Sequence, residues 1–191
     1  MDRKRATLTG LAAILLWSTM VGLIRSVSEG LGPVGGAAMI YTVSGLLCLV
    51  TVGFPDLRRF SRRYLLAGSI LFVSYEMCLA LSLGYAATRS QAIEVGMVNY
   101  LWPSLTIAFA ILFNGQKSTL WVIPGLLISL LGVCWVLGGE NGLQLNDIMQ
   151  NVVSSPLSYG LAFAGAFIWA AYCTVTSKYA KGQNGITLDR K

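Results

Sequence analysis

A stripe of polar and aromatic side chains runs along one face of the otherwise apolar segment Glu94–Leu105 and the residue after it. In a helix, which turns by 100° per residue, four side chains fall within about 60° of one another. They are Val95, Asn99, Trp102 and Thr106. Pro103 has no amide hydrogen, so it predicts a helix break that frees the carbonyl of Asn99 from its usual partner. A freed carbonyl in an apolar environment needs protein or water nearby. The stripe therefore predicts the wall of a cavity.

A second candidate is Glu76, which lies twelve residues after the start of the apolar run Tyr64–Ala87. Burying an ionisable side chain deep in a membrane-spanning segment costs about 2.5–3.5 kcal/mol on insertion scales, so such a side chain usually faces a cavity or a partner. Protonation, a structural hydrogen bond to a hydroxyl or amide, and exposure to a wet pathway all remain open. Glu94 has a simpler interpretation, because a carboxylate in the first turn of a helix caps the dipole.

Trp17 and Ser18 lie deep in the first apolar run, away from the interface where tryptophan is usually found. Trp17 is as well explained by packing as by contact with a ligand. Tyr75 precedes Glu76, and Tyr100 lies about 100° from the direction of Asn99, so its place in a cavity is less secure than that of Trp102.

The segments that must position these residues belong to a membrane protein. Of 191 residues, 55% are hydrophobic and 12% are charged, and the mean hydropathy is +0.66, which is unlike a soluble domain. We expect an all-α polytopic protein with six transmembrane helices, each near the spanning length of about 20 residues. The expected spans are Ala6–Ile24, Val34–Phe54, Tyr64–Ala87, Ile93–Phe113, Leu120–Gly138 and Leu157–Ser177. In the loop after the fifth span, Leu143–Val153 suits a short amphipathic segment at the membrane surface.

Basic residues predict the orientation, because they are enriched in cytoplasmic loops. Only Arg25 and Arg89 lie on the opposite side from the others, so both termini are expected in the cytoplasm and the loop 139–156 outside. The net charge of +6 is explained by this topology, and nucleic-acid binding is not expected. The residues on the cytoplasmic side are Arg3, Lys4, Arg5, Arg58, Arg59, Arg62, Arg63, Lys117, Lys178, Lys181, Arg190 and Lys191.

Several chemistries are not expected. Without histidine, His-based metal sites and His general bases are excluded, and no nucleotide-binding signature is present. Cys48, Cys78, Cys134 and Cys173 fall inside spans without paired spacing, which favours packing. We therefore expect no enzyme activity, no metal and no cofactor.

An internal repeat connects the two ends of the chain. Laying Leu11–Met20 over Phe163–Tyr172 aligns Trp17 with Trp169 at an offset of 152 residues. The two spans are five apart, so a duplicated unit would cross the membrane in the opposite direction, as in many secondary transporters. The expected division is a first repeat at 1–138, a periplasmic loop at 139–156, and the first helix of a truncated second repeat with a cytoplasmic tail at 157–191.

Four runs of sequence carry a family resemblance: Leu15–Arg25, Ser74–Tyr85, Gln91–Leu105 and Phe167–Thr176. They resemble the EamA-type drug/metabolite transporter superfamily of bacterial inner membranes. The resemblance implies ten spans in two inverted five-helix repeats around a central cavity, with export of aromatic amino acids and related compounds. Spans seven to ten are missing, so we expect a truncated exporter embedded in the lipid bilayer.

On this basis we expect a cavity that holds an aromatic ring by stacking and edge contacts, each adding about 0.5–1.5 kcal/mol beyond area burial. Asn99, Ser18 and Glu76 are candidates for the amino acid head group, and Glu76 could instead carry a coupled proton. Tyr172 would join Trp169 on the wall from the second repeat. The candidates for the ring are Trp17, Trp102, Trp169, Tyr75 and Tyr100.

Two alternatives remain open. A multidrug exporter would use the same aromatic residues for flat cations, with Glu76 as the counter-charge. A non-transporting half would self-associate or assemble with a missing second half.

Overall fold

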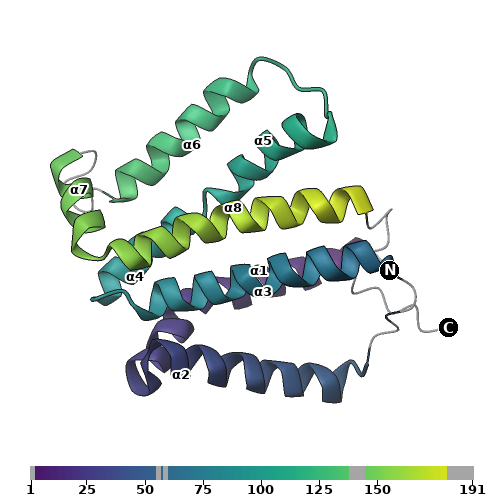
Figure 1. Cartoon of the computed structure of the whole chain (residues 1–191), viewed down its shortest axis with the longest axis horizontal. Coiled ribbons are helices and arrows are strands. Elements are labelled where there is room, and N and C mark those ends of the chain that lie inside the picture. The colour runs from purple at the N-terminus through teal and green to yellow at the C-terminus, as the bar shows by residue number, and fades with distance from the viewer. Residues whose placement is uncertain (1–2, 55–56, 58–59, 138–144, 180–191) are drawn as a thin grey trace.

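The computed structural model describes residues 3–54, 57, 60–137 and 145–179. Within these residues the chain is all-helical, as expected, and the helices are arranged as in Figure 1. The helices are α1 (Arg3–Ser18), α2 (Met20–Thr51), α3 (Arg62–Gly84), α4 (Arg89–Asn99), α5 (Trp102–Asn114), α6 (Val122–Leu137), α7 (Leu145–Ser154) and α8 (Pro156–Tyr179).

Four helical stretches in the described residues are long and apolar enough to cross a membrane, where six spans were expected. The first two expected spans lie together in the 45-residue stretch Thr7–Thr51. The fifth corresponds to α6, which has only 16 residues. The remaining three long apolar stretches are Arg62–Gly84, Arg89–Asn114 and Pro156–Tyr179. The chain is therefore a multi-pass membrane protein.

The long first stretch bends at Gly32, where the backbone leaves the helical region with φ 74° and ψ 164°. A positive φ favours glycine because it has no Cβ, and Pro33 directly after it cannot donate a helical hydrogen bond. The second part of α2 therefore turns back along the bundle (Figure 1). Gly84 at the end of α3 packs tightly on this turn, since a Cβ at Gly84 would lie 2.9 Å from Cα of Pro33.

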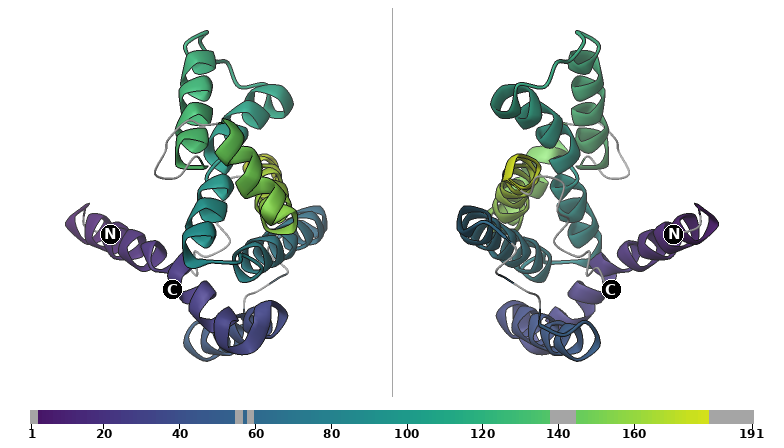
Figure 2. Two further views of the ribbon diagram at one scale, coloured as in Figure 1. Left: turned by 90° about the vertical axis from the view of Figure 1, so that its left-hand side faces the viewer. Right: turned by 90° about the vertical axis from the view of Figure 1, so that its right-hand side faces the viewer.

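The centre of the molecule is formed by α8, which packs most extensively against α3 and also contacts α4 and α5. Small residues at helical spacing on α8 are fully buried and allow this close approach. They include Ala162, Ala166 and Ala170, each with no exposed surface. By contrast, α1 points away from the other helices (Figure 2).

Two helix starts explain where the chain enters the membrane segments. Ser61 caps α3 by accepting a hydrogen bond from the amide of Tyr64, and Thr88 caps α4 by accepting one from the amide of Gln91.

Because α4 begins at Arg89 rather than at Ile93, Glu94 lies beyond its first turn. The expectation that Glu94 caps this helix was wrong. Its carboxylate accepts hydrogen bonds from the Tyr159 hydroxyl at 2.7 Å and the Asn151 amide at 3.1 Å.

Asn151 belongs to α7, so the expected amphipathic segment is a helix over its described residues. Its polar side chains Asn151 and Ser154 bond to α4, while Met149 and Val153 are about two-thirds exposed. The apolar side of α7 is thus the one left for lipid. Residues 139–144 of the loop lie outside the described residues. So do some of the basic residues used to predict orientation, namely Arg58, Arg59, Lys181, Arg190 and Lys191.

Candidate functional site

A cavity of about 270 Å³ lies where the end of α1 and the start of α2 meet α3, α4 and the start of α5. Six of the nine residues predicted for the site line it. Its remaining lining is apolar and includes Leu79 and Leu83 from α3. The six predicted residues are Trp17, Ser18, Tyr75, Asn99, Tyr100 and Trp102.

The expected stripe is interrupted at the break before Pro103. Helix α4 ends at Asn99 and α5 begins at Trp102, with 3₁₀-type bonds from the amides of Tyr100 and Leu101 to Met97 and Val98 at 3.0 and 3.1 Å. A uniform 100° rotation does not continue across such a break. Asn99 and Trp102, which flank the break, line the cavity, whereas Val95 and Thr106 do not, and this corrects the expectation.

Val95 is fully buried in the core, and the hydroxyl of Thr106 donates to the carbonyl of Trp102 at 2.7 Å. Tyr100, which the helical spacing placed less securely, lines the cavity instead and is half-exposed.

Asn99 provides a polar group at the cavity wall. Its side-chain amide donates to the Tyr75 hydroxyl at 3.2 Å, while its Oδ1 is buried without a hydrogen-bond partner. A buried unpaired acceptor is costly, at about 1–3 kcal/mol. This oxygen lies close to Gly165 of α8, where a Cβ would be in ordinary van der Waals contact with it at 3.5 Å. Asn99 therefore borders the cavity and carries an unpaired acceptor that is buried on its α8 side.

Trp169 of α8 lies behind the cavity rather than in its lining. Its ring is 4.4 Å from that of Tyr75 and 6.2 Å from that of Trp102, the latter in an edge-on arrangement at 80°. The ring of Tyr172 lies 5.0 Å from that of Trp169 and is tilted by 31° against it. These are the distances of favourable aromatic pairs. Trp169 thus holds the two cavity rings in place, and Tyr172 supports Trp169.

Glu76 is separated from the cavity and faces a groove that α3 forms with α1 and α2. Its Oε2 accepts a hydrogen bond from the Tyr41 hydroxyl at 2.9 Å, and its carbonyl oxygen accepts one from the same hydroxyl at 2.8 Å. The groove has a volume of about 820 Å³ and is mainly apolar, and Trp17 borders both spaces. Glu76 and Asn99 therefore do not share one head-group site.

Sequence patterns missed two contributors to these spaces. Tyr41 lies in the second expected span, and nothing in its spacing pairs it with Glu76. Gly96 lines the cavity, and a Cβ there would be 3.4 Å from Val21. Its position one helical turn before Asn99 is the signal that could have revealed it.

Comparison with known families decides the class of this protein. The sequence profile of the EamA-like transporter family matches residues 4–138, well over half of the 191 residues. The chain belongs to the EamA-like transporter family. The matched region contains every residue that lines the cavity. The cavity is therefore part of the transporter fold.

Curated relatives match nearly the whole chain. It is 76% identical over 188 residues to the aromatic amino acid exporter YddG of Salmonella typhimurium strain 14028s, and 73% identical over 188 residues to that of Escherichia coli K12. Identity to the aromatic amino acid exporter YddG of Ancylobacter novellus is 29% over 187 residues. These matches cover 98%, 98% and 95% of this chain but 64%, 64% and 61% of the relatives. No solved structure matches.

Proposed function

We propose that the cavity binds aromatic amino acids and that the protein serves in their export across a bacterial inner membrane. The observation that carries this proposal is the lining itself. Two tryptophans and two tyrosines line a space that Asn99 also borders, and the side chain of Asn99 has a buried acceptor without a partner. The rings suit an aromatic side chain, and the acceptor suits an ammonium group. The relatives' names agree with this substrate class.

The arrangement in the membrane that we propose has six crossings. The stretch Thr7–Thr51 would be about 68 Å long as one helix, more than twice the bilayer core of about 30 Å. The turn at Gly32 allows it to cross twice. Helix α6 would supply the fifth crossing, and Trp121 just before it is 82% exposed.

In this scheme α1 to α6 form a five-span repeat, and α8 begins an inverted second one. Transporters built from such repeats place substrate near the midplane, at broken helices. The break between α4 and α5 at the cavity is the matching feature here. Both termini are then in the cytoplasm by the positive-inside rule. We infer that the protein works by transport rather than catalysis.

Binding of radiolabelled phenylalanine to the purified 191-residue chain in detergent tests the substrate class. We expect saturable binding, weakened about tenfold by Trp102→Ala, because a lost ring contact and its buried area together are worth about 1.4 kcal/mol or more. Trp121→Ala is the matched control, since Trp121 is exposed and outside the cavity lining. Equal binding by the two variants would contradict the proposal.

Efflux of phenylalanine from resting cells that express the chain tests transport itself. Export above the level of empty cells, lost in Trp102→Ala, supports an exporter. Binding without export, together with a dimeric or mixed mass in detergent, would instead indicate a half that requires a partner.

One observation favours a second candidate function. Glu76 lies in the apolar groove beside α1, and a carboxylate in an apolar setting attracts flat cations. A multidrug exporter would bind a cationic dye more tightly than tryptophan and would lose the dye on Glu76→Gln. If the protein binds tryptophan more tightly than the dye, and Glu76→Gln does not affect tryptophan binding, a multidrug exporter is excluded.

A further inference from the structure

A second hollow adjoins the cavity at the end of the bundle where α3 joins α4. It has a volume of about 470 Å³ and shares Ser18, Val21, Gly96 and Tyr100 with the cavity lining. We call this hollow the vestibule. Beyond the shared residues its wall includes Arg25 and Arg89. A molecule that leaves or enters the cavity on this side passes two guanidinium groups.

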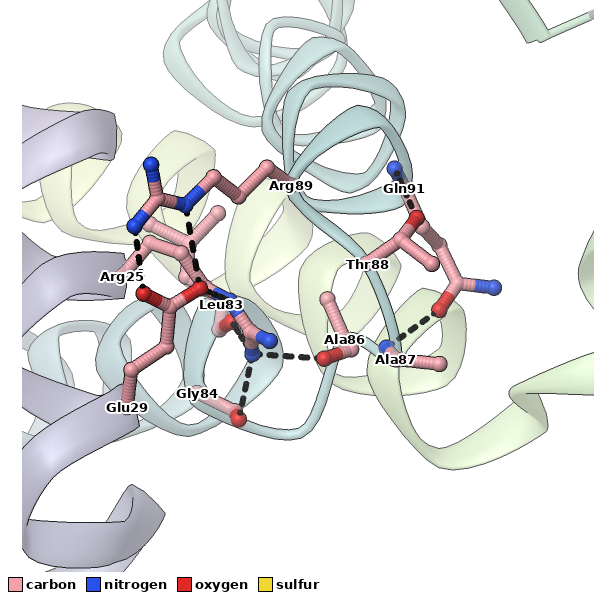
Figure 3. A network of polar contacts seen from close by, with 9 residues as sticks. All are labelled: Arg25, Glu29, Leu83, Gly84, Ala86, Ala87, Thr88, Arg89 and Gln91. Carbon is pink, nitrogen blue, oxygen red and sulfur yellow. Dashed lines mark hydrogen bonds and ion pairs between the residues drawn. The ribbon is translucent and has the colours of Figure 1, made fainter.

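The two arginines are held in different ways (Figure 3). Arg25 is only 13% exposed and donates hydrogen bonds to the carbonyls of Gly84 at 3.1 Å and Ala86 at 2.5 Å. These carbonyls follow the end of α3, where helical partners run out. Arg25 therefore has a structural task, because it ties α2 to the end of α3.

Arg89 is 75% exposed and donates two hydrogen bonds to Glu29, from Nε at 3.2 Å and from Nη2 at 2.8 Å. Exposed ion pairs of this kind contribute little to stability. Glu29 also accepts a bond from Nε of Arg25 at 3.2 Å, so it keeps a cationic partner when Arg89 leaves. Arg89 can thus exchange Glu29 for another carboxylate at small cost.

The charges facing the vestibule favour an anion. Arg25 and Arg89 belong to its wall, whereas Glu29 does not. A guanidinium group binds a carboxylate through two parallel hydrogen bonds, which a single ammonium cannot match. Arg89 lies eleven residues before Tyr100, or about 16 Å along the helix axis. An amino acid whose ring contacts Tyr100 can direct its polar end along the vestibule toward Arg89, since both residues line this hollow.

We propose that Arg89 binds the carboxylate of the amino acid in the vestibule, displacing Glu29, while the ring contacts Tyr100. This inference rests on the proposed function, since it assigns the carboxylate of the same substrate. Glu29 then acts as an internal competitor that returns to Arg89 when the substrate leaves.

Comparison of phenylalanine with phenylalaninamide, which lacks the carboxylate, tests the assignment in the purified chain. Arg89→Gln is expected to weaken phenylalanine binding about tenfold, as the loss of charged hydrogen bonds implies, and to leave phenylalaninamide binding unchanged. Glu29→Gln is expected to strengthen phenylalanine binding several-fold without affecting the amide. Misfolding cannot produce such a gain. Lys117→Gln removes an equal charge outside the vestibule and is expected to change the binding of neither ligand.

An equal effect of Arg89→Gln on both ligands would overturn the assignment of the carboxylate to Arg89. The absence of a gain in Glu29→Gln would also overturn it. Both outcomes leave the proposed function standing if the unaltered chain binds phenylalanine. Absence of phenylalanine binding by the unaltered chain would overturn the proposed function and this inference together.

Discussion

The two walls of the cavity differ in how firmly the protein holds them. The packed wall, formed by Tyr75 and Asn99, is 3% and 6% exposed and is backed by α8. The arm wall comes from the end of α1, where Trp17 is 51% exposed. Figure 2 shows this arm leaving the bundle. The site therefore has one wall that is preorganised by packing and another whose position depends on a loosely attached helix.

This contrast separates two contributions to binding. Loss of an aromatic ring from the packed wall or from its support is expected to alter stability and ligand affinity together, because those rings also fill the core. Changes on the arm wall are expected to alter affinity alone. Preorganised groups bind at lower cost, since less conformational freedom is lost.

The largest effect is expected for Trp169→Ala, which removes the support of the packed wall. Loss of this ring leaves a void beside Tyr75 and Trp102 and lowers the free energy of unfolding by about 3 kcal/mol. This loss corresponds to a fall in the apparent melting temperature of roughly 6–12 °C. Trp17→Ala is the partner variant and is expected to change the melting temperature little while weakening phenylalanine binding. Thermal unfolding in detergent measures both, and equal destabilisation by the two changes would remove the distinction between the walls.

A smaller effect is expected for Gly84→Ala, where the new Cβ would overlap the backbone of Pro33 at 2.9 Å. Overpacking of this kind costs about 1–3 kcal/mol. Gly10→Ala in α1 is the matched control, because no atom lies within 4 Å of its Cβ position. Alanine also favours the helix there by roughly 1 kcal/mol. A lower melting temperature for Gly10→Ala than for Gly84→Ala would show that the arm is the tighter region.

The smallest effect on stability is expected for Asn99→Leu. The change removes a buried acceptor that has no partner in the fold, which favours the folded state, and it also removes the hydrogen bond to the Tyr75 hydroxyl, which opposes this gain. The two effects on stability are of similar size and offset each other. We expect phenylalanine binding to fall about tenfold or more with an unchanged melting temperature. A parallel fall in both quantities would mean that Asn99 serves folding rather than the ligand.

Much of the fold follows from the sequence because apolar length and turn chemistry act locally. The helices, the break before Pro103 and the aromatic candidates were all found in this way. Span boundaries were less accurate at Glu94, since the cap at Thr88 starts α4 four residues before the expected Ile93. The count of spans also differed for two reasons. The first two expected spans form one helical stretch that bends at Gly32, and α6 has only 16 residues.

The sequence by itself determined which faces of individual helices carry chemistry, since a side chain's direction on one helix depends only on its spacing. Asn99 and Trp102 were identified on that basis, whereas Trp169 was identified by its alignment with Trp17. Only the tertiary structure decided how those faces meet. It paired Asn99 with Tyr75, directed Glu76 toward Tyr41 and away from the cavity, and brought Arg89 to Glu29 across 60 residues of chain. The rotation of one helix against another is set by packing of small residues such as Gly165, and spacing along a single helix does not contain it.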